Sequence, residues 1–296
     1  MSISLFPFEP WATIHQQQVE DALARVMPSE ETSPSRLHSA MRYAVLGGGK
    51  RVRALLSYAA AELVRAPAKS TDAAAVAVEL IHAFSLVHDD MPCMDDDDLR
   101  RGKPSCHKQY GDATALLVGD ALQSLAFQTI ADTNAPQALK QVQILAQATG
   151  SRGMCGGQSI DLQSTGQLLT RNELETMHQY KTGALIRAAT LLGAYAAEST
   201  SEAHISLLNQ YSENMGLAFQ VVDDILDATA DTQTLGKTAG KDALQEKSTY
   251  VSLLGIEEAN ALVKRLYEQT LQLLAGFDKQ ADPLRAIARF ICERTS

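Results

Sequence analysis

Two clusters of aspartates restrict the chemistry of this 296-residue chain more than any other feature. The first runs from Asp89 to Asp98 and the second from Asp223 to Asp227, and apolar residues precede both. Carboxylates placed so closely repel one another and resist burial, so they need compensating cations. Because no Cys/His ligand set accompanies them, their oxygens suit a hard ion, above all Mg²⁺. One acidic run is as often a solvated helix end, but two runs in apolar helices predict a metal site for an anion.

The spacing within each cluster indicates how its carboxylates can be arranged. Asp223 and Asp227 are four residues apart, so on a helix they share one face, about 40° apart. Asp89 and Asp95 are six residues apart, which an ideal helix would place about 240° apart. A proline between them removes an amide donor and disfavours helical geometry at the residue before it. A break there would bring Asp95 back beside Asp89, whereas an unbroken helix would favour Asp96, and the spacing leaves both open.

Basic residues flank both clusters and can hold an anion. Arg100 and Arg101 follow the first cluster, and Lys50, Arg51 and Arg53 follow three glycines upstream. Glycines expose backbone amides, and a helix that begins just after them adds the positive end of its dipole. The run lacks the spacing of a P-loop, and alone it is better interpreted as a helix cap with solvated charges. Beside two acidic clusters, the same residues predict a phosphate cradle.

A candidate loop and one histidine add to this prediction. The stretch from Thr229 to Lys247 is rich in Gly, Thr, Lys and Asp, which predicts a mobile loop. Lys237 and Lys247 in this stretch can close over a bound anion. His82 lies two helical turns before Asp89, so it points along the acidic face of the same predicted helix.

The elements that must position these residues are predicted to be helices. Hydrophobic residues make up 45% of the chain and aromatic residues only 5%, and Ala and Leu are abundant. This composition favours helices that pack through small side chains, and no strand alternation is convincing. Since no Pro/Gly/Ser linker divides the chain, we expect one all-α domain over residues 1–296. Periodicity and capping signals predict helices over 34–46, 51–64, 71–89, 112–130, from 136 onward, and over 170–195, 199–227, 252–274 and 283–293.

Composition also argues against several classes of protein. The net charge of −9, with no basic stripe, argues against a nucleic-acid partner. No segment approaches the roughly 20 uncharged apolar residues that span a bilayer, and the N-terminus does not have the pattern of a secretion signal. The four cysteines show no C-x-x-C pair or zinc-like spacing, which predicts reduced thiols and a cytoplasmic protein.

Five motifs occur together in the order of a known family. They are Gly-Gly-Lys-Arg-x-Arg at 48–53, Asp-Asp-x-x-x-x-Asp at 89–95 with Arg-Arg-Gly at 100–102, Gly-Gly-Gln-x-x-Asp-Leu at 156–162, Lys-Thr-Gly at 181–183, and Phe-Gln-x-x-Asp-Asp-x-x-Asp at 219–227. Over residues 40–250 the chain resembles a trans-isoprenyl diphosphate synthase of the bacterial short-chain type. The resemblance implies a single-domain helical bundle of the isoprenoid synthase type around a deep central cavity. Ala54 stands where the family usually has Pro, a change that a helix accommodates.

The resemblance also implies a role for each site residue. Three Mg²⁺ ions would hold the allylic diphosphate on Asp89, Asp95 and Asp223, a set that favours Asp95 over Asp96. Behind them, metal or water would be oriented by Asp90, Asp224 and Asp227. The allylic diphosphate would also contact Arg100, Lys181, Gln220, Lys237 and Lys247. Isopentenyl diphosphate, held without metal, would contact Lys50, Arg53, His82 and Arg101. The passing allylic cation would be stabilised by Lys181, Thr182 and Gln220.

The implied reaction is ionisation, condensation and elimination. Mg²⁺ stabilises the departing diphosphate, isopentenyl diphosphate attacks the allylic cation, and a proton is lost. Dimethylallyl and then geranyl diphosphate would be extended to farnesyl diphosphate, with geranyl or geranylgeranyl diphosphate as alternative final products. Phe84, five residues before Asp89, is the expected plug of the product pocket, with Ser85 beside it. Because the family is usually homodimeric, the resemblance implies a homodimer.

Three other classes of protein fit the motifs less well. A class I terpene cyclase shares an aspartate-rich helix, but its second metal motif usually mixes Asn/Asp, Ser/Thr and Glu. A non-catalytic subunit of a hetero-oligomeric synthase typically loses one aspartate cluster, and both are intact in this sequence. A helical binding scaffold would leave the combined acidic and basic residues unexplained.

Overall fold

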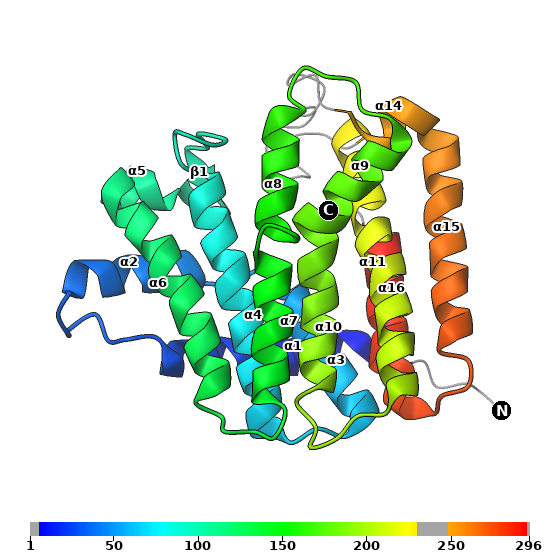
Figure 1. Cartoon of the computed structure of the whole chain (residues 1–296), viewed down its shortest axis with the longest axis horizontal. Coiled ribbons are helices and arrows are strands. Elements are labelled where there is room, and N and C mark those ends of the chain that lie inside the picture. The colour runs from blue at the N-terminus through cyan, green and yellow to red at the C-terminus, as the bar shows by residue number, and fades with distance from the viewer. Residues whose placement is uncertain (1–5, 230–247, 295–296) are drawn as a thin grey trace.

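The computed structural model of the chain describes residues 6–229 and 248–294, which form a bundle of helices (Figure 1). The helices are α1 (Phe8–Val26), α2 (Ser35–Val45), α3 (Val52–Val64), α4 (Ala68–Asp89), α5 (Cys106–Tyr110), α6 (Asp112–Ala131), α7 (Ala138–Thr149), α8 (Met154–Gln163), α9 (Arg171–His178), the π-helix η1 (Gln179–Gly183), α10 (Ala184–Ala194), α11 (Glu202–Thr229), α14 (Tyr250–Leu254), α15 (Ile256–Leu273), the 3₁₀-helix η2 (Lys279–Ala281) and α16 (Asp282–Glu293). Strands β1 (Leu99–Arg100) and β2 (Lys103–Pro104) pair as a short antiparallel hairpin. The predicted all-α fold class is confirmed.

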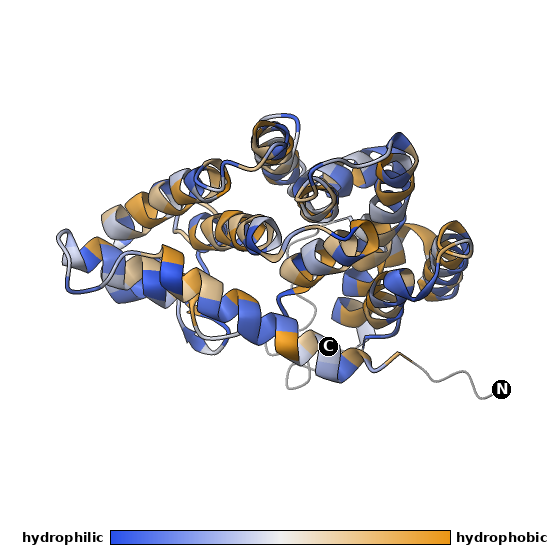
Figure 2. Ribbon diagram, turned by 90° about the horizontal axis from the view of Figure 1, so that it is seen from below, coloured by the Kyte–Doolittle hydropathy of each residue, from blue (hydrophilic) through white to orange (hydrophobic). Residues whose placement is uncertain are grey.

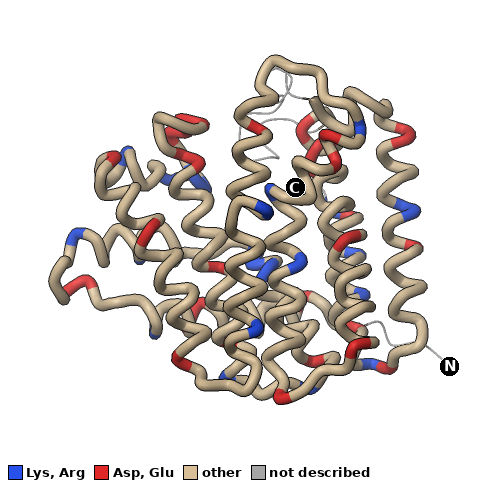
Figure 3. Tube along the Cα trace, viewed as in Figure 1, with Lys and Arg blue, Asp and Glu red and all other residues tan. Residues whose placement is uncertain are grey.

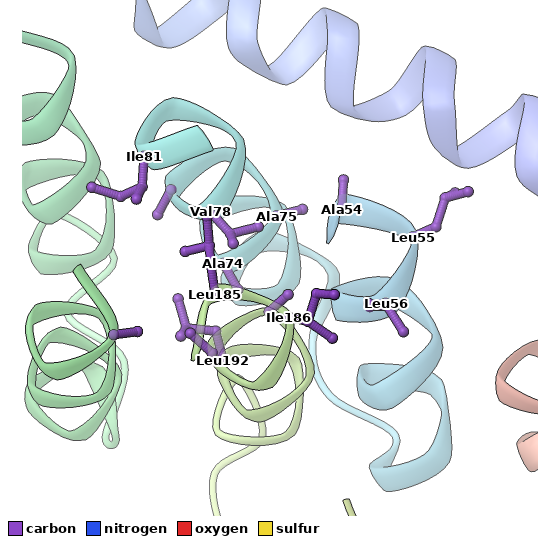
Figure 4. Packing of buried hydrophobic residues seen from close by; sticks show 14 of the residues in the cluster. Ala54, Leu55, Leu56, Ala74, Ala75, Val78, Ile81, Leu185, Ile186 and Leu192 are labelled. Atoms are coloured by element: carbon purple, nitrogen blue, oxygen red, sulfur yellow. The ribbon is translucent and has the colours of Figure 1, made fainter. Parts of the chain in front are cut away.

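The core is built where small side chains let helices approach closely. The most extensive contacts join α4 to α6, α3 to α10, and α11 to α15. A Cβ atom added at Gly193 on α10 would come within 2.1 Å of the Ser57 carbonyl oxygen on α3, so the two backbones touch there. Figure 4 shows Ala74 and Val78 of α4 beside Leu185 of α10. These contacts are the close packing that the Ala-rich composition predicts.

Helix α4 is long and apolar, and the first aspartate cluster begins at its end. It is long and apolar enough to cross a membrane by length and composition alone, but 72% of its apolar window is buried inside the protein. Packing against α3, α6 and α10 accounts for that burial. Viewed from below, hydrophobic residues face mainly into the molecule and hydrophilic residues lie mainly on the outside (Figure 2).

Two predicted helix boundaries are wrong for local reasons. Thr71 and Asp72 do not cap α4, which begins three residues earlier at Ala68. The Thr71 hydroxyl donates back to the Pro67 carbonyl at 2.9 Å, and the Asp72 carboxylate accepts from the Tyr58 hydroxyl at 2.8 Å. The helix predicted over 252–274 is divided into α14 and α15, because Gly255 adopts a left-handed φ of 78° between them.

The helix predicted over 170–195 begins as expected but is not continuous. Thr170 and Glu173 form the predicted capping box at the start of α9. The segment η1 then interrupts the α-helix with one π turn before α10 begins. Sequence periodicity also missed α1, α5, α8, η2 and the β1–β2 hairpin. The loop predicted up to Lys247 lies outside the described residues from residue 230 onward, and so do Lys237 and Lys247.

Candidate active site

The first aspartate cluster turns back on itself at the end of α4. The Asp95 amide donates to the Asp89 carbonyl at 2.9 Å, and the Asp96 amide donates to the Met91 carbonyl at 3.2 Å. This turn is the break that the proline predicts, and it places Asp89 and Asp95 in the lining of one cavity. Asp96, with a φ of 47°, points instead toward Lys108, whose Nζ lies 3.7 Å away. The geometry therefore pairs Asp95, and not Asp96, with Asp89.

The second cluster faces the same cavity from α11. Asp223 and Asp227, one helical turn apart, both line it, as their spacing predicts. Asp224 also reaches the cavity, but its carboxylate accepts a hydrogen bond at 2.7 Å from the Tyr250 amide at the start of α14. Asp224 thus ties α11 to α14 as well as adding charge. Figure 3 shows acidic residues near the end of α11 and in the segment that follows α4.

The shared cavity has a volume of about 360 Å³ and a strong excess of negative charge. Its cationic side chains are Arg100 and Lys181, and its carboxylates belong to Asp89, Asp95, Asp97, Asp161, Asp223, Asp224 and Asp227. Within residues 6–229 and 248–294, no three His, Cys, Asp or Glu side chains converge closely enough to hold an ion by themselves. An all-oxygen set on separate walls fits Mg²⁺, which usually takes one or two carboxylates and completes its shell with water and substrate phosphate.

Burial changes the acidity of Asp89. It raises the pKa of this carboxyl from 3.8 to about 6, although Lys181 opposes the shift. Asp95 adds to the shift by repulsion, which places the two carboxylates within electrostatic reach of each other. Gln158 on α8 donates a hydrogen bond to Asp89 from the opposite wall. Asp89 is thus a partly desolvated carboxylate that a cation would stabilise.

Asp90 plays a different part from its neighbour. It is buried, and its carboxylate receives hydrogen bonds from Arg100, whose Nε lies 3.1 Å from Oδ1. Burial raises the pKa of Asp90, and Arg100 opposes that shift. Asp90 therefore anchors Arg100, which lies in β1 and lines the acidic cavity beside Asp97.

Lys181 and Thr182 are placed by the π-helix η1. Lys181 Nζ lies 2.6 Å from Asp161 Oδ2 on α8. Burial alone would lower the pKa of Lys181, but Asp161 and Asp89 outweigh it and raise the pKa. A Cβ atom at Gly157 would lie 2.1 Å from the Lys181 amide nitrogen, so only glycine lets α8 approach η1 this closely. A π turn at such a position is typical of functional sites.

A second cavity of about 260 Å³ adjoins the first. It is lined by Arg53, His82 and Thr182, and it shares the side chains of Leu86, Asp89, Lys181, Gln220 and Asp223 with the acidic cavity. The Nε of Arg53 is buried without a hydrogen-bond partner among the described residues, so an acceptor entering this cavity would satisfy it. Burial and the nearby arginines lower the pKa of His82 well below 6.5, so at neutral pH it is an uncharged hydrogen-bonding group.

The remaining basic residues of the predicted cradle are divided between two roles. Arg51 is buried and pairs with Glu20 at 2.6 Å and Glu79 at 3.0 Å, so it holds the turn together. Arg101 donates to the Gly48 carbonyl and joins the hairpin to the glycine turn. Much of Lys50 is exposed, but partial desolvation of its amine and the nearby Arg294 lower its pKa. Asp223 opposes this shift, which places Lys50 near the second cluster.

Phe84 lies on α4, one residue before Ser85 and five before Asp89. It is buried, and its ring meets the ring of His88 edge-on at 4.9 Å. Ser85, its neighbour, lines the second cavity, whereas Phe84 is in neither of the two linings just described. The role of Phe84 as the plug of the product pocket stays a prediction.

Three functional candidates were not assigned a role from the sequence. Gln158 and Asp161 lie three residues apart on α8 and face Asp89 and Lys181, and their helical spacing within the Gly-Gly-Gln-x-x-Asp-Leu motif was an available signal. Arg294 lies just after α16 and contacts Asp223 at 2.8 Å. No pattern near Arg294 indicates this contact, because only the fold brings the C-terminal helix to α11.

Comparison with known proteins places this architecture in a family. The sequence matches the model of the polyprenyl synthetase family over residues 34–283. It is 44% identical to the farnesyl diphosphate synthase of Escherichia coli (strain K12), covering 94% of this chain and 96% of that protein. It is also 44% identical to a heterodimeric geranylgeranyl pyrophosphate synthase large subunit of Arabidopsis thaliana, over 98% of this chain and 78% of that protein.

A solved structure gives the same result. The FPP/GFPP synthase of Zymomonas mobilis superposes with a TM-score of 0.86 at 38% identity, covering 96% of this chain and 98% of that one. The chain therefore belongs to the polyprenyl synthetase family and has the fold of the isoprenyl diphosphate synthases.

Proposed function

We propose that this protein is a Mg²⁺-dependent prenyltransferase that condenses isopentenyl diphosphate with dimethylallyl and then geranyl diphosphate to give farnesyl diphosphate. One observation carries the proposal: an acidic cavity and a cavity lined by Arg53 and His82 meet at Asp89, Lys181, Gln220 and Asp223. Two diphosphates bound in these cavities would place their reacting carbons at the junction. The Escherichia coli relative is named a farnesyl diphosphate synthase, which supports the fifteen-carbon product, and the Zymomonas mobilis protein is named an FPP/GFPP synthase, which includes that product.

The two cavities suit different diphosphates. The acidic cavity would take the allylic substrate with Mg²⁺, three ions in all, on Asp89, Asp95 and Asp223. When bound, Mg²⁺ supplies Lewis-acid stabilisation of the negative charge on the leaving diphosphate. The second cavity would take isopentenyl diphosphate, with Arg53 as a charged donor and His82 as a neutral one, supported by Lys50 and Arg101.

The residues at the junction would control the reaction. The allylic C–O bond breaks with its electron pair on the diphosphate oxygen, toward which the protonated Lys181 and Arg100 direct positive charge. The isopentenyl double bond then forms the new C–C bond, and loss of the neighbouring proton to diphosphate restores a double bond. The oxygens of Thr182 and Gln220 would face the carbocation, and the apolar packing beside Leu86 would exclude water.

A longer product is the second candidate. The Arabidopsis thaliana relative named as a geranylgeranyl pyrophosphate synthase subunit is as similar in identity as the Escherichia coli enzyme. Ser85 is a small side chain among the α4 residues that line the second cavity, whereas the aromatic ring of Phe84 is buried outside that lining. Ser85 leaves room for a longer prenyl chain, whereas the ring of Phe84 would limit the length of that chain.

Product analysis tests the proposal directly. The purified protein is incubated with Mg²⁺, isopentenyl diphosphate and dimethylallyl diphosphate, and the dephosphorylated products are separated by chromatography. We expect farnesol as the main product, and a twenty-carbon alcohol would establish the alternative instead. A parallel incubation with farnesyl diphosphate and Mg²⁺ tests for a terpene cyclase, which would give cyclised hydrocarbons or alcohols there. No product in either incubation would exclude the enzymatic proposal.

Assembly and location complete the proposal. We infer one domain over residues 1–296 and a homodimer that packs through α6, where Leu116 and Leu117 are 47% and 54% exposed. Light scattering at micromolar concentration tests the dimer, and substitution of both leucines by serine should shift it toward monomer. We also infer a cytoplasmic location, which the four free cysteines support.

A further inference from the structure

The C-terminal end of the described chain supplies a cation to the second aspartate cluster. Arg294 Nη2 donates to Asp223 Oδ1 at 2.8 Å and to the Phe219 carbonyl at 2.7 Å. Its guanidinium also lies 3.9 Å from the centroid of the Phe219 ring. Since Phe219 and Asp223 are four residues apart on α11, the guanidinium spans one helical turn of that motif.

The contact is close but incomplete. The Arg294 side chain is only 8% exposed, whereas that of Asp223 is 40% exposed and lines both cavities. The Nε of Arg294 is buried without a hydrogen-bond partner among the described residues. A pair joined through one nitrogen lacks the two parallel hydrogen bonds that make arginine–carboxylate contacts strong. Asp223 is thus satisfied by Arg294 while remaining open to a competing cation.

We propose that Arg294 is a resident counter-ion of Asp223 that gives up this carboxylate when metal and diphosphate bind together. The inference rests on the proposed function, in which Asp223 is a metal ligand. A divalent ion on Asp223 would face the guanidinium, and Lys50 and Arg53 already lie within electrostatic reach of the same carboxylate. Such crowding disfavours a metal ion alone, whereas a diphosphate brings enough negative charge to hold both cations.

As a consequence, the site would bind metal weakly until its diphosphate substrate is present. Without diphosphate, the incoming ion must displace a partly buried guanidinium. With diphosphate, the metal is shared between Asp223 and phosphate oxygens, and the displaced guanidinium gains an anionic neighbour. Arg294 would then favour the binding of metal and diphosphate together, and it would reduce the binding of metal to the site when diphosphate is absent.

Binding of Mn²⁺, measured from the electron paramagnetic resonance signal of the free ion, tests this proposal. The full-length protein, Arg294→Gln and the matched control Arg289→Gln, five residues earlier on α16, are titrated with and without the S-thiolo analogue of dimethylallyl diphosphate. Without the analogue, we expect Arg294→Gln to bind Mn²⁺ about three- to fivefold more tightly than the other two proteins. With the analogue, this advantage should disappear or reverse. Thermal unfolding followed by circular dichroism verifies that all three proteins are folded.

The outcomes separate the inference from the proposed function. Equal Mn²⁺ affinity of the unsubstituted protein and Arg294→Gln without the analogue would overturn the inference, provided that the unsubstituted protein retains Mn²⁺ when the analogue is present. If the unsubstituted protein retains no Mn²⁺ even with the analogue, the metal site of the proposed function is itself wrong. Tighter binding by Arg289→Gln as well would show a general charge effect and would also overturn the role of Arg294.

Discussion

Burial favours the protonated form of Asp89, although the proposed metal site requires its ionised form. Burial raises its pKa from 3.8 to about 6, so between these pH values the folded protein binds a proton that the unfolded chain releases. The free energy of unfolding contributed by this group therefore falls as pH rises through that range. Asp89→Asn should abolish the proposed condensation while making the metal-free protein more stable at pH 7.5, by about 1–2 kcal/mol.

Denaturant unfolding in EDTA at pH 4.5 and 7.5 measures this difference. The gain from Asp89→Asn should be larger at the higher pH, where the unsubstituted protein must keep the buried carboxylate charged. Asp120→Asn, an exposed substitution on α6, serves as the control and should leave both values unchanged. A gain from Asp89→Asn that is equal at both pH values would contradict the argument, because a packing effect has no such pH dependence.

Phe84 can be tested by the length of the product. Phe84→Ala removes a buried ring from α4 and should open space behind Ser85, so the main product should move from fifteen to twenty or more carbons. Loss of a buried aromatic ring also costs about 3–5 kcal/mol, so the assay is run well below the unfolding midpoint. Mass spectrometry of the prenyl alcohols gives the chain length, and an unchanged product from a folded variant would leave Phe84 as core packing alone.

Single residues differ in how far the sequence can place them. The choice between Asp95 and Asp96 depended on whether a proline breaks the helix, and the sequence contains that proline. The roles of Asp90 and Arg51 were harder to predict from the sequence. A charged residue near a motif can face either the cavity or an internal ion-pair partner, and the sequence does not distinguish these two cases. Arg294 was beyond reach, since its contact with Asp223 depends on how the C-terminal helix packs against α11.

At the scale of elements, the contact between α8 and η1 determines where Lys181 lies. A Cβ atom at Gly157 would meet the Lys181 amide nitrogen at 2.1 Å, and backbone cannot move aside as a flexible side chain can. Gly157→Ala should therefore separate α8 from η1, weaken the Lys181–Asp161 pair and cost about 1–3 kcal/mol in stability. We expect a large loss of activity, seen mainly in the turnover number.

The matched control for this substitution is Gly276→Ala, because nothing lies within 4 Å of the added atom there. Steady-state kinetics and thermal unfolding of both variants make the comparison. If Gly157→Ala retains full turnover and stability, the close approach of α8 to η1 is not what positions Lys181.

The same elements show why periodicity predicts helices better than their interruptions. The apolar pattern of residues 170–195 is continuous, yet one π turn is inserted at 179–183, where the backbone of α8 presses against η1. Such a turn depends on a tertiary contact, and it leaves no local signal. By contrast, the capping box at Thr170 is a local hydrogen-bond pattern, and the structure contains it as predicted. The missed helices α1 and α8 had no comparably clear signal at their ends.

At the scale of the whole molecule, the binding site lies between parts of the chain that are far apart in sequence. The first cluster ends α4, the second lies on α11, and α8 and η1 contribute Gln158 and Lys181 from between them. The sequence predicts that two clusters must meet, because like charges in apolar helices require a common cation. The sequence does not predict which walls of the cavity carry the two aspartate clusters, because their positions depend on how all the helices pack.

A ligand that bridges these walls should stabilise the entire fold. Mg²⁺ with the S-thiolo analogue of dimethylallyl diphosphate binds only the folded protein, so at a hundred times its dissociation constant it adds about 2.7 kcal/mol to the free energy of unfolding. Differential scanning calorimetry should show a rise of about 4–5 °C in the unfolding temperature, which EDTA reverses. Asp223→Asn should lose the rise, whereas Asp120→Asn should keep it. An equal rise with the analogue alone, in EDTA, would mean that the basic residues hold the diphosphate without metal, and the carboxylates would then need another explanation.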